Sequence, residues 1–119
     1  MKIEVSIGEI VDKYTIIAIK LLKIKDEEKL KNIKKEYNYL DDIIKNLNIE
    51  DIDTLDLMDI NNKLWDIENH KRQCEKDNDF GELFIDSARN VYKFNDERAR
   101  IKKAINIKYG SEFHEEKSY

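Results

Sequence analysis

The sequence predicts an all-α protein folded as an antiparallel up-down four-helix bundle. The 119 residues include no proline and only three glycines, and 40% are hydrophobic and 40% charged. This composition is typical of helix-rich proteins and lacks the turn residues that an all-β fold requires. Apolar residues recur at intervals of three and four, the spacing of one helix face. The length fits one modest core, so we expect a single helical domain over 1–119.

The first predicted helix, over about 7–25, is the most apolar one and is expected to lie at the centre. Ser6 and Glu9 stand as Ser-x-x-Glu, the pattern of a capping box, with Val5 in the staple position. The residues before it alternate polar and apolar and predict a short N-terminal extended arm. The apolar face is widened beyond that of a surface helix by Ile16, Ile19 and Leu22, so it needs partners on more than one side.

Three further helices are predicted over about 27–47, 54–77 and 80–109, followed by a polar tail over 110–119. The second has a narrow coiled-coil-like seam, and an acidic loop over 49–54 separates it from the third. The fourth keeps the same alternation of three and four, and Gly110 marks its end. The seam of the second helix consists of Leu30, Ile33, Tyr37, Leu40, Ile44 and Leu47, and that of the third of Leu57, Ile60, Leu64 and Ile67.

The fourth predicted helix is too long for the bundle. At 1.5 Å per residue it spans about 42 Å, against about 28 Å for the first helix. The overhang must either project or be covered by a second subunit. We therefore expect a homo-oligomer, most simply a homodimer.

The first cluster of candidate site residues lies on the first helix. Glu9 and Asp12 are spaced i, i+3, with Lys13 beside them, so the two carboxylates can share a cation. Together with Asp56 and Asp59, which have the same spacing, they could form the two halves of a magnesium site. Alternatively, these acids only complement the helix dipole and pair with lysines. We favour the second interpretation and expect no metal or cofactor.

Polar interruptions of the last two helices form the other candidate clusters. Asn95 and Arg98 stand where Leu or Ile is expected, with Tyr92 nearby, and a buried arginine needs a partner. Glu68 falls near the middle of the third helix, so a Glu68–Arg98 pair is plausible. Such a pair either fixes the helix register or lines a polar pocket, where a guanidinium suits phosphate or carboxylate. Trp65 beside Glu68, with Asn61 and Arg72 on neighbouring turns, either forms a pocket wall or closes the core.

Charge and composition exclude several classes of partner. The net charge of −4 is mild and mixed, so the protein does not match nucleic acid electrostatically. No apolar stretch reaches the roughly 18 residues that a membrane span requires. The single cysteine, Cys74, allows no internal disulfide and suggests a reducing compartment, so we expect a cytoplasmic protein.

Five strings of residues form a recognisable pattern along the chain: VSIGEIVDK (5–13), LWDIE (64–68), ARNVY (88–92), NDERA (95–99) and EEKSY (115–119). Together they resemble a family of small bacterial helical proteins known only as a domain of unknown function. The resemblance spans nearly the whole chain but implies no established activity, cofactor or catalytic residue. Its strings fall on the clusters described above and on the tail, which favours one shared pocket made by Glu9, Asp12, Lys13, Trp65, Glu68, Asn95 and Arg98.

Three functions follow from these observations. The first is a small binding or accessory protein that holds an anionic small molecule or a protein partner at the pocket, with Arg98 and Lys13 unpaired by protein acids. The second is a magnesium-dependent hydrolase of a nucleotide or sugar nucleotide, which needs three or more converging carboxylates. The third is a purely structural homo-oligomer, in which every polar core residue is paired and no pocket exists.

Overall fold

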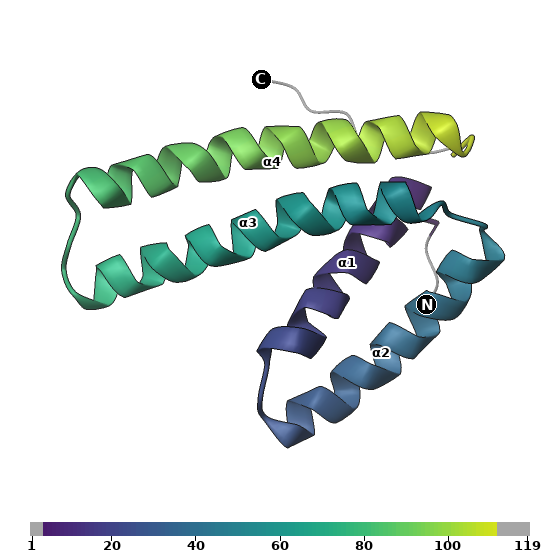
Figure 1. Cartoon of the computed structure of the whole chain (residues 1–119), viewed down its shortest axis with the longest axis horizontal. Coiled ribbons are helices and arrows are strands. Elements are labelled where there is room, and N and C mark those ends of the chain that lie inside the picture. The colour runs from purple at the N-terminus through teal and green to yellow at the C-terminus, as the bar shows by residue number, and fades with distance from the viewer. Residues whose placement is uncertain (1–3, 112–119) are drawn as a thin grey trace.

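The computed structural model describes residues 4–111 and shows an all-α four-helix bundle (Figure 1). This part of the chain contains no strand. The predicted fold class is therefore confirmed. The helices are α1 (Ile7–Lys23), α2 (Glu27–Asn46), α3 (Asp51–Lys76) and α4 (Glu82–Lys108).

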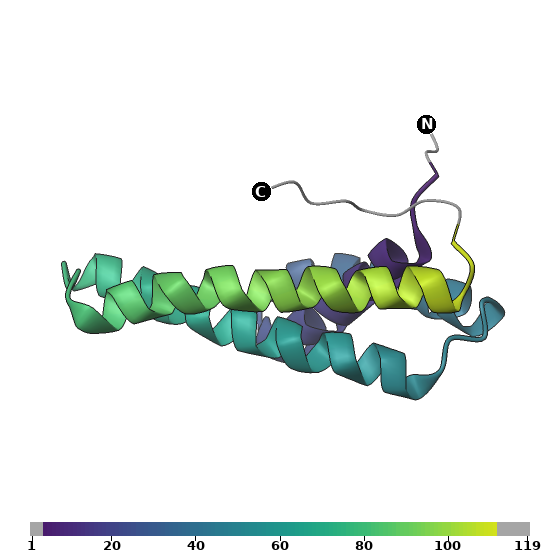
Figure 2. The ribbon, with the colours of Figure 1, turned by 90° about the horizontal axis from the view of Figure 1, so that it is seen from above.

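The helices form two antiparallel hairpins, and α1 is the central helix, as predicted. It contacts each of the other three, whereas α2 lies beside α1 alone and α3 packs along α4. The α1–α2 hairpin lies obliquely against the end of the α3–α4 hairpin where α3 begins and α4 ends (Figure 1). The view from above shows α1 and α2 beside only one half of that longer hairpin (Figure 2). The other half projects.

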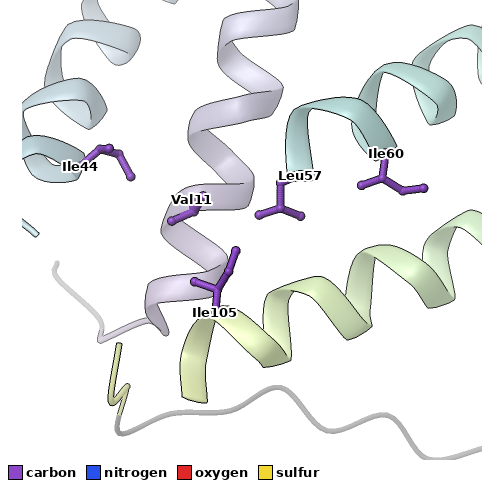
Figure 3. Packing of buried hydrophobic residues seen from close by; sticks show 5 residues of the cluster. All are labelled: Val11, Ile44, Leu57, Ile60 and Ile105. Carbon is purple, nitrogen blue, oxygen red and sulfur yellow. The ribbon is translucent and has the colours of Figure 1, made fainter. Parts of the chain in front are cut away.

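The main core lies where all four helices meet. Its five buried side chains converge in Figure 3, and Val11 and Leu57 are completely inaccessible to solvent. They come from the predicted apolar faces of the four helices. The five residues are Val11, Ile44, Leu57, Ile60 and Ile105.

A second core cluster joins α1 to α2 along the predicted seam of α2. Ile17 of α1 packs against Ile33 and Leu40 of α2. Beside them the rings of Tyr14 and Tyr37 stack with centroids 5.3 Å apart. Burial and the hydrogen bonds with Tyr37 and Asp41 raise the pKa of Tyr14, so its hydroxyl stays neutral.

The start of α1 is capped as the sequence indicates, but only by half of the capping box. The Ser6 hydroxyl accepts the backbone N–H of Glu9 at 3.1 Å. The Glu9 carboxylate is directed to Lys102 of α4 instead. Residues 4 and 5 of the expected arm have no regular secondary structure, and Val5 is exposed. The rest of the arm, residues 1–3, lies outside the described part.

The predicted acidic loop over 49–54 is wrong, because α3 already begins at Asp51. Acidic residues in the first turn complement the positive end of a helix. In addition, Asp53 accepts hydrogen bonds from Lys108 at 2.8 Å and from Tyr109 at 2.5 Å, both at the end of α4. Burial opposes ionisation of Asp53, but these two hydrogen bonds outweigh it and lower its pKa. The helix start is thus set by a tertiary contact.

The remaining helix boundaries differ from the predicted ones by one or two residues. Helix α1 ends at Lys23, because Ile24 is extended, and α4 begins after Gly81 rather than at Phe80. Of the predicted polar tail over 110–119, Gly110 and Ser111 follow α4, and residues 112–119 lie outside the described part. No helix between residues 4 and 111 is both long and apolar enough to cross a lipid bilayer.

The overhang expected from the helix lengths is present. Helix α4 has 27 residues and α1 has 17, which correspond to about 40 Å and about 26 Å. The radius of gyration of 16.0 Å exceeds the ~13.5 Å expected for a compact chain of this length. The molecule is therefore extended by the projecting half of the α3–α4 hairpin.

Candidate functional site

A buried ion pair between α1 and α4 is the centre of the candidate site. The carboxylate of Asp12 is 1% exposed and binds the Arg98 guanidinium through both oxygens. The Nε–Oδ1 distance is 2.9 Å, and Nη2 donates to Oδ2. Fork-like pairs of this kind fix the guanidinium in one orientation. The predicted need of Arg98 for a partner is met by Asp12 of α1, not by Glu68, whose carboxylate lies 3.8 Å from Lys71.

Helix α3 contributes an amide that completes the surroundings of Asp12. Asn61 donates from Nδ2 to Asp12 Oδ1 at 2.9 Å and to the Thr15 hydroxyl at 2.8 Å. The Thr15 hydroxyl in turn donates to the backbone carbonyl of Asp12 at 2.7 Å. Each of these groups is buried, and each contact is a normal hydrogen bond. The network connects α1, α3 and α4 through polar groups.

A second cation, Lys102 of α4, lies one turn from Arg98. Its side chain is 7% exposed, and its Nζ lies 2.7 Å from Glu9 and 3.9 Å from Asp12. Two cations therefore accompany two carboxylates between α1 and α4. Such a balance is needed because an uncompensated buried charge costs several kcal/mol.

The N-terminus of α1 is held tightly against α4 next to this network. The backbone N–H of Gly8 donates to the side-chain oxygen of Asn106 at 2.6 Å. A Cβ at Gly8 would lie 2.5 Å from the backbone oxygen of Lys102, closer than real Cβ contacts occur. Only glycine allows the two helices this approach. The contact fixes the axial position of α1, and with it that of Asp12.

A cavity of about 360 Å³ opens between α1, α3 and α4, and we call it the central cavity. Arg98 and Asn61 belong both to its wall and to the buried network. The remaining polar lining comes from consecutive turns of α3 and from Asn95 of α4. The full lining is Ile16, Ile19, Asn61, Leu64, Trp65, Glu68, Asn69, Arg72, Asn95 and Arg98.

The structure brings four of the predicted site residues together in this lining: Trp65, Glu68, Asn95 and Arg98. Asp12 lies directly behind Arg98. Lys13 is on another side of α1, where it pairs with Glu36 of α2 at 3.5 Å. Tyr92 is 62% exposed on the projecting part of α4 and does not belong to the lining.

The two acidic pairs of the magnesium hypothesis lie in different places. Glu9 and Asp12 bind the cations of α4, whereas Asp56 and Asp59 line a separate surface pocket with Lys63, which binds Asp59 at 3.2 Å. Within residues 4–111, no three His, Cys, Asp or Glu side chains are placed to hold a metal ion. The convergence of carboxylates that a hydrolase needs is therefore not seen among these residues.

Sequence reasoning missed Thr15, Lys102 and Asn106. A signal for two of them was present, because Lys102 and Asn106 are spaced by four and share one face of α4 with Asn95 and Ala99. This face lies beside the apolar seam that packs on α3, and it packs on α1. A search for a second buried stripe on the longest helix would have found it.

The chain matches, over residues 1–119, a family described as a family of unknown function, DUF6165. It belongs to this family. The resemblance suggested by the sequence strings, to a family of unknown function, agrees with this. Comparison of the DUF6165 chain with curated proteins and with solved structures found no match. The function must therefore be argued from the site itself.

Proposed function

We propose that this DUF6165 protein binds a small anionic molecule in the central cavity. The observation that carries the proposal is the position of Arg98. Its guanidinium is held by the buried Asp12, yet its side chain is 28% exposed at the cavity wall. A cation that is fixed before the ligand arrives loses little entropy on binding.

The chemistry of the lining supports an anionic group. The lining contains two guanidiniums and three side-chain amides but only one carboxylate, that of Glu68. Asp12 balances the charge of Arg98 and Lys71 balances that of Glu68, so Arg72 supplies the uncompensated positive charge of the lining. Arg72 is exposed and forms no ion pair with another residue of the 4–111 range. A planar guanidinium suits carboxylate or phosphate in a bidentate contact.

The size and apolar part of the cavity favour a small ligand over a protein partner. A volume of about 360 Å³ is at the lower end of the range for small-molecule sites. Ile16, Leu64 and Trp65 supply an apolar wall, against which a ring or short chain can pack. A small molecule with one anionic group and one apolar part fits this combination.

A thermal-shift screen tests the proposal. The probes are inorganic phosphate and pyrophosphate, nucleoside phosphates, and di- and tricarboxylates. A ligand at 100 times its dissociation constant adds about 2.7 kcal/mol to the free energy of unfolding. For a chain of this size 1 kcal/mol corresponds to roughly 3–6 °C, so this raises the melting temperature by about 8–16 °C. The affinity of each probe that shifts it is then measured by calorimetry.

Arg72→Ala is the diagnostic variant, because Arg72 is exposed and its removal leaves the buried network intact. We expect it to weaken binding by about tenfold or more, the effect of one charged contact. Arg100→Ala is the matched control, because Arg100 lies on another face of α4 and pairs with Glu97. The proposal is wrong if no probe stabilises the wild type, or if Arg72→Ala binds as tightly as Arg100→Ala.

A further inference from the structure

Helix α4 carries a second stripe of residues beside the seam that packs on α3. The stripe alternates steps of three and four, so its side chains share one face of the helix. Its C-terminal part faces α1, and its N-terminal part lies on the projecting half of the hairpin. The stripe consists of Ile85, Ala88, Tyr92, Asn95, Ala99, Lys102 and Asn106.

The two halves of the stripe differ in burial. Lys102 and Asn106 are 6% and 0% exposed and bind Glu9 and the Gly8 backbone of α1. Beyond α1, Ile85 is 47% and Tyr92 62% exposed. This end of α4 extends past both α1 and α2 in Figure 1. The stripe therefore forms one continuous interaction face, whose C-terminal half is covered by α1 and whose N-terminal half is covered by none of the described residues.

Four charged residues accompany the exposed half on the side away from α3. Glu82 and Asp86 come first, and Arg89 and Lys93 follow. All four are exposed, and none forms an ion pair with any residue of the described range. Both Glu82–Asp86 and Arg89–Lys93 are like-charge pairs at i, i+4, which are unfavourable within one helix. Because the two acidic residues come before the two basic ones, this segment of α4 is complementary in charge to a second copy of itself that runs antiparallel.

We propose that two copies of this chain associate through the N-terminal halves of α4, packed antiparallel about a two-fold axis near Ala88. The small Ala88 side chain lets the two helices approach, and Ile85 of each copy packs on Tyr92 of the other. The same axis places the acidic half of each helix against the basic half of its partner, which relieves both like-charge pairs. A two-fold interface of this kind uses the same patch on both subunits.

The order of the charges distinguishes a second copy from an unrelated protein partner. Only self-association about a two-fold axis requires that each acid before Ala88 be matched by a base at a similar distance after it. An unrelated partner could be matched by any order of charges. The symmetry of the pattern therefore favours a homodimer and locates the dimer that the helix lengths suggested.

Sedimentation equilibrium of the full chain tests the location of this interface. We expect a dimer for the wild type and a dissociation constant raised at least about tenfold by Ile85→Asp. Leu83→Asp is the matched control, because Leu83 is 63% exposed two residues away but lies off the stripe. It should leave the dimer unchanged, and circular dichroism should show both variants folded. A monomeric wild type at about 100 μM, or equal effects of the two variants, overturns the proposal.

Charge reversal tests the antiparallel arrangement. The double variant Glu82→Lys, Asp86→Lys makes all four charged positions basic. The double variant Arg89→Glu, Lys93→Glu makes all four acidic. Each double variant should therefore be monomeric. An equimolar mixture of the two should form a heterodimer. The variant with all four reversals should again form a homodimer but should not mix with the wild type. A fourfold variant that stays monomeric, or that mixes freely with the wild type, overturns the antiparallel arrangement.

Discussion

Loss of Arg98 should destabilise the protein through the charge that it leaves behind. In Arg98→Met the carboxylate of Asp12, 1% exposed, loses its bidentate partner and keeps only Asn61 at 2.9 Å and Lys102 at 3.9 Å. Removing one partner of a buried ion pair costs about 3–5 kcal/mol. Because Lys102 remains, we expect a value near the lower limit, about 3 kcal/mol.

The converse change should cost less. Asp12→Asn keeps the shape of the side chain, and the guanidinium it releases is 28% exposed and can turn towards the central cavity. We expect a loss of about 2 kcal/mol, the contribution of hydrogen bonds to a charged group. With both changes present no uncompensated charge remains from this pair. The double variant should then lose about 3 kcal/mol rather than the sum of about 5 kcal/mol, a coupling of about 2 kcal/mol.

Urea denaturation followed by circular dichroism measures all three variants, with free energies taken from the midpoint at a common slope. Arg100→Met is the matched control: Arg100 carries the same charge two residues away, its side chain is 72% exposed, and its ion pair with Glu97 should contribute less than about 1 kcal/mol. The reasoning is refuted if Arg98→Met and Arg100→Met destabilise equally, or if the two single changes are additive.

Three further predictions concern packing and the end of α4. Gly8→Ala should lower the free energy of unfolding by about 1–3 kcal/mol, because the new Cβ would overlap the Lys102 carbonyl. Gly81→Ala has no close backbone neighbour and should change it by less than about 0.5 kcal/mol. Thermal melts compare the two variants. Leu57→Ala should lower the free energy of unfolding in urea by about 2–5 kcal/mol, because Leu57 is fully buried. Leu55→Ala should lower it far less, because Leu55 is exposed. Asp53→Asn should lose about 1.5–3 kcal/mol at pH 7. Since the pKa of Asp53 is lower in the folded state, its contribution is present above its unfolded pKa of about 3.9 and is lost as the pH falls through the folded value. The difference in unfolding free energy between wild type and Asp53→Asn should therefore shrink as the pH falls below about 3.9. A difference that stays constant at acidic pH would contradict the assignment.

The site residues show how far sequence reasoning can go. Arg98 stands out because it interrupts an apolar seam, and the prediction that it needs a partner is confirmed. The identity of the partner was not predictable. Counting residues along parallel helix axes pointed to Glu68 on the neighbouring helix, whereas the oblique crossing of α1 brings Asp12, 86 residues away, onto the guanidinium. The binding hypothesis also expected Arg98 and Lys13 to be unpaired by protein acids, and this mark is not met, because Arg98 pairs with Asp12 and Lys13 with Glu36.

Periodicity by itself determined four helices, their inward faces and the excess length of the last one, because the spacing of apolar residues fixes the rotation of each helix about its own axis. It contains no information about axial shift or crossing angle between helices. Those were decided by tertiary contacts, among them the close approach of Gly8 to α4 and the hydrogen bonds of Asp53 with the end of α4. They determine which polar side chains meet, where the central cavity opens and which half of α4 is left exposed.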